Sequence, residues 1–386
     1  MDEQKLLFSL IRTVICNEKP DSVLQAACTP ELLERTYTLA KHHDLAHIMG
    51  QAVSAMELPP CDIVTVIRQA AFTAAIRDAR RSHDFSQLCQ TLEAAACPFI
   101  PLKGSVLCRY YPQPWMRTSC DIDILVQEAE LERVAGILVD RLGYRYVKKT
   151  SHDISLISQG NVCLELHYST IEDAVSPSAS RILEGIWEQA KPVEAGHFHM
   201  EIPDSLFYFY HMAHMAKHFI NGGCGLRTVL DTWILENRVP HDARKRRQLL
   251  QKGGLFAFAQ AAEKLSRIWF EGEETDRLSD EMAQFILSGG TYGTVNNKVS
   301  IHQQKKGGKL GYALSRIFLP YDIIKYHYPV LMKHKVLLPV FQVVRWGKLL
   351  FCGGVGRSVR ELKSNATLSA EEGETARTLL GYLGLE

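Results

Sequence analysis

Apolar positions along the chain change their period twice. Over residues 3–96 they recur every three or four positions, which is the spacing of amphipathic helices, and the same spacing returns after residue 200. In between, short apolar stretches are separated by turn-forming residues, a pattern typical of strands. The predicted strands cover residues 99–102, 119–126, 144–148, 153–158 and 162–168. We expect a helix among them over Gln127–Leu142, because Gly143 follows its last turn.

This change of period predicts an α+β protein in three parts. An N-terminal helical region covers residues 1–96, a small mixed sheet with helices covers 97–200, and a C-terminal helical region covers 201–386. The chain has 386 residues and is 46% hydrophobic, so it is long enough to bury a large core.

Charge and cysteine content exclude several classes of protein. The 44 Lys and Arg residues nearly balance the 43 Asp and Glu residues, so no strong overall field attracts nucleic acid or membrane. The ten cysteines contain no C-x-x-C pair, which argues against a zinc ribbon and against a disulfide framework. The N-terminus lacks the features of a signal peptide, and no stretch of 18 apolar residues predicts a spanning helix. We therefore expect a cytoplasmic protein.

The segment Pro101–Val126 contains the first candidate chemistry. Asp121 and Asp123 alternate with isoleucines in a predicted strand, so the two carboxylates share one face. Paired carboxylates repel each other unless a cation lies between them, and their oxygens are ligands that Mg²⁺ prefers. Gly104 and Ser105 stand where a strand turns into a helix, a position that offers donors to a phosphate. The combination predicts a site for a nucleoside triphosphate with Mg²⁺.

A third carboxylate is expected from the last predicted strand. Glu165 and His167 alternate there with leucines, which places both on one face. Glu165 completes the acidic set that a two-metal site requires, and we expect His167 to be hydrogen-bonded beside it. The predicted catalytic and metal-binding residues are Asp121, Asp123 and Glu165.

These motifs resemble those of the DNA polymerase beta-like nucleotidyltransferase superfamily. More closely, LKGSVLCRYYPQPWMRTSCDIDILV is similar to the bacterial family of uncharacterised nucleotidyltransferases. The fifteen residues between Ser105 and Asp121 form a longer spacer than the superfamily pattern has. The resemblance implies a polymerase beta-like core, an NTP co-substrate and two Mg²⁺ ions, with Mn²⁺ as a substitute. The acceptor would attack the α-phosphorus in line, and pyrophosphate would leave.

The resemblance also implies further binding residues. The family has Lys-His at the end of one helix and Arg and Asp on the next. In addition, Lys103 directly precedes the Gly-Ser turn and Arg117 lies four residues before Asp121, so both could contact phosphate. The nucleotide-binding or acceptor-binding candidates are Lys103, Gly104, Ser105, Arg117, Lys217, His218, Arg227 and Asp231. Arg227 and Asp231, four positions apart, could instead pair with each other.

Three other patterns each leave two interpretations. His211, His214 and His218 share a helix face, which indicates either zinc or, as we prefer, a packed face. The clusters Lys245–Arg247 and Lys305–Lys306 could bind RNA, but solvated surfaces are favoured. Residues 328–352 are apolar, aromatic and basic, which indicates either peripheral membrane contact or, as we prefer, helices docked on the core.

We therefore predict transfer of a nucleoside monophosphate from an NTP to a hydroxyl or phosphate of an unidentified acceptor. The acceptor could be a small molecule, a peptide or RNA, because fold-level likeness does not specify a substrate. One alternative is a nucleotide-binding or scaffold module without turnover. The other is a toxin-like enzyme that nucleotidylates RNA or protein.

Overall fold

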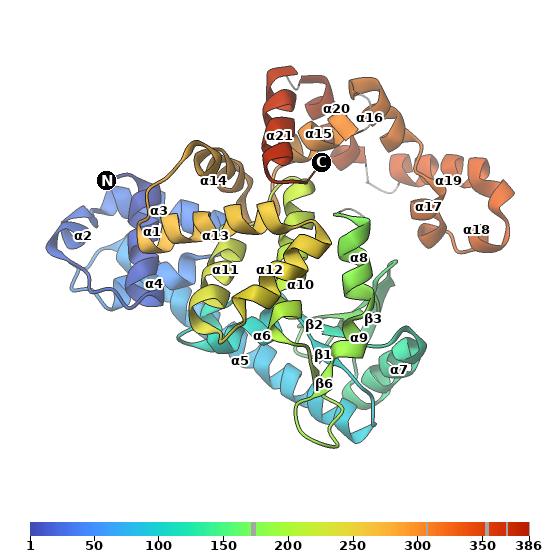
Figure 1. The fold of residues 1–386 in the computed structure, drawn as a ribbon, viewed down its shortest axis with the longest axis horizontal. Helices are drawn as coiled ribbons and strands as arrows, with labels where there is room; N and C mark the ends of the chain where they lie inside the picture. Colours follow the sequence, from blue (N-terminus) through green and yellow to red (C-terminus); the bar gives the residue numbers. More distant parts are fainter. Residues whose placement is uncertain (171–174, 306–307, 352–354, 368–369, 386) are drawn as a thin grey trace.

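The computed structural model describes residues 1–170, 175–305, 308–351, 355–367 and 370–385. It shows a largely helical chain around a small mixed sheet (Figure 1). The predicted α+β class is therefore confirmed.

The N-terminal region consists of helices that begin at well-formed caps. The side chains of Asp2, Asp21 and Thr29 each accept a hydrogen bond from a backbone N–H of the first turn, and Pro30 occupies a first-turn position that needs no donor. The helices are α1 (Glu3–Ile15), α2 (Ser22–Ala27), α3 (Pro30–His42), α4 (Ala46–Ser54) and α5 (Asp62–Ala94). α4 and α5 approach closely at Gly50, where an added Cβ would lie 2.5 Å from the Ile67 carbonyl oxygen.

All five predicted strands occur in one sheet. They are β1 (Ile100–Pro101), β2 (Asp121–Leu125), β3 (Arg145–Lys149), β4 (Asp153–Ile157) and β5 (Cys163–His167). Their order is β1-β2-β5-β4-β3, with β2 and β5 parallel and the other neighbours antiparallel. Between β1 and β2 lie the short helices α6 (Gly104–Leu107), η1 (Cys108–Tyr110) and η2 (Pro114–Met116). η3 (Glu128–Glu130) and α7 (Leu131–Leu142) follow β2, and Gly143 ends α7 with φ +67°, as predicted.

The two faces of the sheet differ in polarity. Ile122, Ile124, Leu164 and Leu166 are buried on the face that packs against α7 and the C-terminal half of α5. Because side chains alternate along a strand, Asp121, Asp123, Glu165 and His167 all lie on the other face. That second face borders helices from the C-terminal region.

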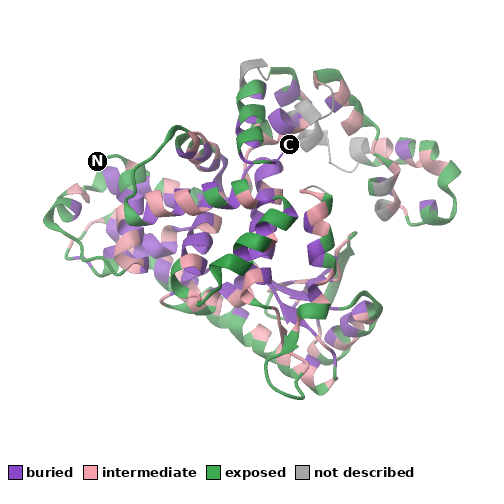
Figure 2. Cartoon of the chain, in the orientation of Figure 1, coloured by how far each residue is buried: buried purple, intermediate pink, exposed green. Residues whose placement is uncertain are grey.

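The helices after the sheet share one core with the N-terminal helices. Leu6, Leu10 and Met49 belong to the same buried cluster as Phe219 and Phe258, and this shared core is the purple interior of Figure 2. The elements are α8 (Pro177–Glu184), α9 (Ile186–Gln189), β6 (Lys191–Pro192), β7 (Met200–Glu201), α10 (Asp204–Ile220), α11 (Leu226–Arg238), α12 (Ala243–Gly253), α13 (Phe256–Glu271) and α14 (Arg277–Gly289). The division at residues 96 and 200 stays a prediction.

The last part of the chain adds further helices, and Ile301 and Leu379 from this part belong to the shared core. These helices are η4 (Gly290–Tyr292), α15 (Val295–Lys305), α16 (Gly308–Ile317), α17 (Tyr321–His327), α18 (Val330–Lys333), η5 (Lys335–Leu337), α19 (Leu338–Phe351), α20 (Val355–Thr367) and α21 (Ala370–Tyr382). α15 packs on α20 and α21, whereas α17 to α19 extend outward from the body (Figure 1). The preferred interpretation of residues 328–352 as helices docked on the core is therefore wrong for the part that the structure describes.

Two other sequence predictions concern this part. Lys306, in the second basic cluster, lies outside the described residues, as does Cys352. Among the described helices, none is long and apolar enough to cross a bilayer.

Candidate active site

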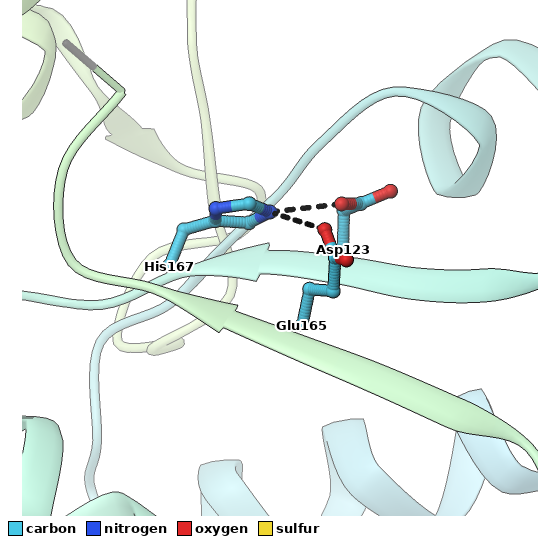
Figure 3. A group of neighbouring side chains, drawn as sticks. All are labelled: Asp123, Glu165 and His167. Atoms are coloured by element: carbon cyan, nitrogen blue, oxygen red, sulfur yellow. Dashed lines mark hydrogen bonds and ion pairs between the residues drawn. The ribbon is translucent and has the colours of Figure 1, made fainter. Parts of the chain in front are cut away.

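The acidic residues meet because β2 and β5 run parallel in a fixed register. Asp123 lies opposite Glu165, and Leu125 lies opposite His167. The side chains of Asp123, Glu165 and His167 point toward one another from these neighbouring strands (Figure 3). His167 Nε2 lies 2.8 Å from Asp123 Oδ1 and 3.4 Å from Glu165 Oε2. The predicted convergence of Asp123 and Glu165 is present in the structure.

The closest potential metal-binding group differs from the predicted one. One ligand atom each from Asp123, Glu165 and His167 lies within 4.8 Å of the others, and within the described ranges this is the only such group. Asp121 falls outside it, and its Oδ1 accepts a hydrogen bond from Ser119 Oγ at 2.6 Å. Burial and the nearby Asp123 carboxylate raise the pKa of Asp121. His167 joins Asp123 and Glu165 in the closest group, and the assignment of Asp121, Asp123 and Glu165 as metal ligands stays a prediction.

Lys103 neutralises part of this acidic cluster. Its Nζ lies 2.7 Å from Asp123 Oδ1 and 3.8 Å from Glu165 Oε2. Lys103 has φ +46°, a backbone conformation that costs energy in a residue with a Cβ and that the surrounding structure must hold in place. Burial lowers the pKa of the Lys103 ammonium, but Asp123, Tyr210 and Glu165 together outweigh this effect and raise it. Asp123 is buried, yet Lys103 and His167 hold its pKa well below the ordinary value.

The Gly-Ser turn is only partly arranged as predicted. Gly104 lines the cavity, and an added Cβ would lie 3.2 Å from Ser119, so the residue permits a close approach. Ser105 does not line it: its amide donates to the Leu102 carbonyl oxygen, and its buried hydroxyl has no hydrogen-bond partner among the described residues. The predicted Ser105 contact with phosphate is corrected, because the turn directs this side chain away from the cavity. Ser119 supplies the hydroxyl there instead.

Arg117 and Asp231 form a buried ion pair. Arg117 Nε lies 2.6 Å from Asp231 Oδ1, which also accepts a hydrogen bond from the Tyr111 hydroxyl at 2.7 Å. Burial lowers the pKa of Arg117, but Asp231 and Tyr111 together outweigh this effect and raise it. The alternative of an Arg227–Asp231 pair is wrong. Arg117 and Asp231 line the cavity while paired with each other, and direct contact of Arg117 with phosphate stays a prediction.

Arg227 connects the segment before β2 to the N-terminal helices. Its Nη1 atom lies 2.5 Å from Asp44 Oδ2 and 3.1 Å from the Thr118 carbonyl oxygen. Asp44 also accepts a hydrogen bond from the Thr118 hydroxyl at 2.8 Å. Arg227 therefore fixes the backbone that leads into Asp121, while part of its side chain lines the cavity.

Helix α10 forms the opposite wall. His214, Lys217 and His218 line the cavity, and the Nε2 atoms of His214 and His218 are 3.0 Å apart. Burial and the Lys103 charge lower the pKa of Lys217 to about 8. His211 also lines the cavity; its Nε2 lies 3.1 Å from the Thr232 hydroxyl, and burial lowers its pKa to about 4. The choice between zinc and a packed face for these histidines stays a prediction.

Together these walls enclose a cavity of about 410 Å³. This volume falls within the range of roughly 300–1,000 Å³ that small-molecule sites occupy. Acidic side chains from the sheet face basic and imidazole side chains from α10, so the cavity can hold a cation and an anion together.

Comparison with known protein families assigns this arrangement to a class. The family described as "Uncharacterised nucleotidyltransferase" matches residues 30–271. The chain belongs to this family. No curated protein and no solved structure gives a significant match. Membership in the family makes the chain a nucleotidyltransferase, and every acidic and basic residue that lines the cavity lies inside the matched range.

Several cavity residues of this nucleotidyltransferase escaped the sequence reasoning. Ser119 shares the strand face of Asp121 and Asp123, so continued alternation would have identified it. Tyr210 lies seven positions before Lys217, on the same side of α10, and the helical period could have indicated it. Asp44 does not line the cavity but contacts Arg227, which does; it carried no local signal, because its partners Thr118 and Arg227 are far away in the sequence.

Proposed function

We propose that this protein transfers a nucleoside monophosphate from an NTP to a hydroxyl or phosphate of an acceptor, with pyrophosphate release. The observation that carries this proposal is the parallel register that places Asp123 beside Glu165 at the base of a cavity with basic walls. We further propose that the sheet is a polymerase beta-like core, since the paired aspartates and the third carboxylate occupy neighbouring strands.

The donor atoms fit a divalent cation. Asp123 and Glu165 supply carboxylate oxygens and His167 an imidazole nitrogen within 4.8 Å of one another. Two carboxylates with one imidazole suit Mn²⁺ as well as Mg²⁺. Asp121, held by Ser119, lies on the same strand face as Asp123 and is the candidate ligand for a second ion. When bound, such ions would activate the acceptor oxygen and neutralise charge on the phosphates.

The protein side chains then have distinct tasks. His167 Nε2 lies against Asp123 and Glu165 and would exchange these contacts for a bound cation. Lys103 and Lys217 supply positive charge for phosphate oxygens, and Gly104 lets the backbone approach them. His218 contacts His214 and extends the wall toward the nucleotide or acceptor. The contacts of Arg117, Asp231 and Arg227 fix the backbone that leads into β2. These three residues therefore help to position the carboxylates on β2.

One observation favours a second candidate, a nucleotide-binding module without turnover. The Lys103 ammonium already neutralises Asp123, so an anion could bind without a divalent cation. Nucleotide binding that does not depend on metal would support this alternative.

The test combines binding and turnover. Mn²⁺ binding is measured by electron paramagnetic resonance with and without a non-hydrolysable NTP, and pyrophosphate release is measured with NTP alone and with cell-extract fractions as acceptors. We expect Asp123→Asn and Glu165→Gln to reduce both by at least about 100-fold. Asp140→Asn and Glu34→Gln, on exposed helix surfaces, are the matched controls. Wild-type behaviour of Asp123→Asn in both assays would falsify the proposal.

A further inference from the structure

The helices α16 to α19 present an exposed apolar surface outside the family match. On α16, Leu310, Leu314 and Ile317 are exposed and recur at i, i+4 and i+7, so they share one helix face. The buried Tyr312 points from the opposite side of this helix. The packed side of α16 is therefore turned toward α15 and α20, and its apolar stripe is turned away from them.

α19 repeats this arrangement. Gln342 donates to the Leu319 carbonyl oxygen, and Arg345 and Trp346 donate to the Ile317 carbonyl oxygen. These three residues define the side that packs on the end of α16. Val340, Val343 and Val344 lie on the opposite side by helical spacing and are 55%, 60% and 39% exposed. The short helices α18 and η5 add Met332 and Val336, the latter 85% exposed. We call these exposed apolar residues of α16, α18, η5 and α19 the apolar surface.

Charge distinguishes this part of the chain from the remainder. Residues 308–351 contain seven Lys and Arg residues and one Asp, although the whole chain is nearly neutral. Lys333 and Lys335 lie just before Val336 in the chain and are exposed, as are Lys309 and Lys348. Exposed aliphatic side chains beside basic ones are the composition of segments that bind at an anionic bilayer surface.

We propose that α16 to α19 bind the surface of an anionic lipid bilayer through the apolar surface and its neighbouring lysines. The valines and leucines would enter the headgroup boundary while the lysines contact lipid phosphates. Charge complementarity is what selects a membrane as the partner. The proposal does not depend on nucleotidyl transfer, because the carboxylate site lies in a different part of the molecule (Figure 1).

The test is co-sedimentation of the full chain with vesicles of phosphatidylcholine, with and without about 30% phosphatidylglycerol. We expect binding to the anionic vesicles alone, and a marked decrease when salt rises from about 0.1 to about 0.5 M. Val340→Glu combined with Val344→Glu should reduce partitioning by at least about tenfold. Lys333→Gln combined with Lys335→Gln should weaken it in the same direction.

Matched controls use exposed positions elsewhere in the chain. Val23→Glu with Val66→Glu repeats the valine change, and Lys19→Gln with Lys252→Gln repeats the lysine change, at exposed sites outside the apolar surface. Equal binding to neutral and anionic vesicles, or wild-type binding by the Val340 and Val344 variant, overturns the proposal. Light scattering without lipid provides a further check: a dimer that this variant dissociates would assign the surface to a second copy of the chain.

Discussion

The buried pair between Arg117 and Asp231 should contribute strongly to stability. Asp231 is 1% exposed and accepts hydrogen bonds from both Arg117 and Tyr111. Asp231→Ala would leave a buried guanidinium without its counter-charge and a buried hydroxyl without its acceptor. Breaking a buried ion pair in this way costs about 3–5 kcal/mol, and the lost tyrosine hydrogen bond is part of the same network rather than an added amount. Urea unfolding followed by circular dichroism measures this loss.

An exposed ion pair provides the control for this prediction. Arg277 and Glu281 pair at 2.8 Å on the surface of α14, and Arg277 is 86% exposed. Glu281→Ala should therefore cost no more than about 0.5 kcal/mol. Replacing both buried partners, as Arg117→Met with Asp231→Leu, should be less destabilising than Asp231→Ala, because no charge is left buried. The reasoning is refuted if Asp231→Ala lowers the free energy of unfolding no more than Glu281→Ala does. It is also refuted if the loss in the double variant equals the sum of the losses in Arg117→Met alone and Asp231→Leu alone.

Two further predictions concern packing and titration. Gly50→Ala should destabilise the folded protein by about 1–3 kcal/mol, because the new Cβ would lie 2.5 Å from the Ile67 carbonyl oxygen. Gly136→Ala, where no atom lies within 4 Å of the new Cβ, should stabilise it by about 0.5–1 kcal/mol. Equal urea midpoints for the two variants would contradict this prediction. His211 has its pKa lowered from 6.5 to about 4, so the stability that its neutral form supplies is present above pH 6.5 and lost as the pH falls toward 4. Over that window His211→Gln should reduce the dependence of unfolding free energy on pH by up to about 1.4 kcal/mol per pH unit, and an unchanged slope would argue against the burial effect.

The elements of the fold could be predicted where the signal is local. Alternation along residues 119–126 and 162–168 indicated both the strands and the faces that carry Asp123 and Glu165. Gly143 is also a local signal, in this case for the end of α7. Pairing between distant side chains had no such signal. Arg117 and Asp231 are 114 positions apart, and Arg227 and Asp44 are 183 apart, so each looked available for phosphate or for a helical neighbour.

The direction of Ser105 was hidden from the sequence for a different reason. A Gly-Ser turn predicts donors near a helix start, but which side chain enters the cavity depends on the backbone angle of the residue before it. Lys103 has φ +46°, a value that composition does not indicate for a lysine. The helix therefore starts with Ser105 turned inward and Gly104 against Ser119.

Lys103 lies between the proposed metal ligands and the proposed phosphate-binding part of the cavity. Lys103 and His167 both contact Asp123 Oδ1, so a divalent cation that binds this oxygen must compete with an ammonium ion. Displacement would leave Lys103 beside Gly104, at the edge of the cavity where phosphate oxygens are proposed to lie. Since a cation repels the ammonium and a triphosphate attracts it, the two ligands would each favour the other's binding. On this argument, Lys103→Met should strengthen Mn²⁺ binding in the absence of NTP and weaken its enhancement by NTP.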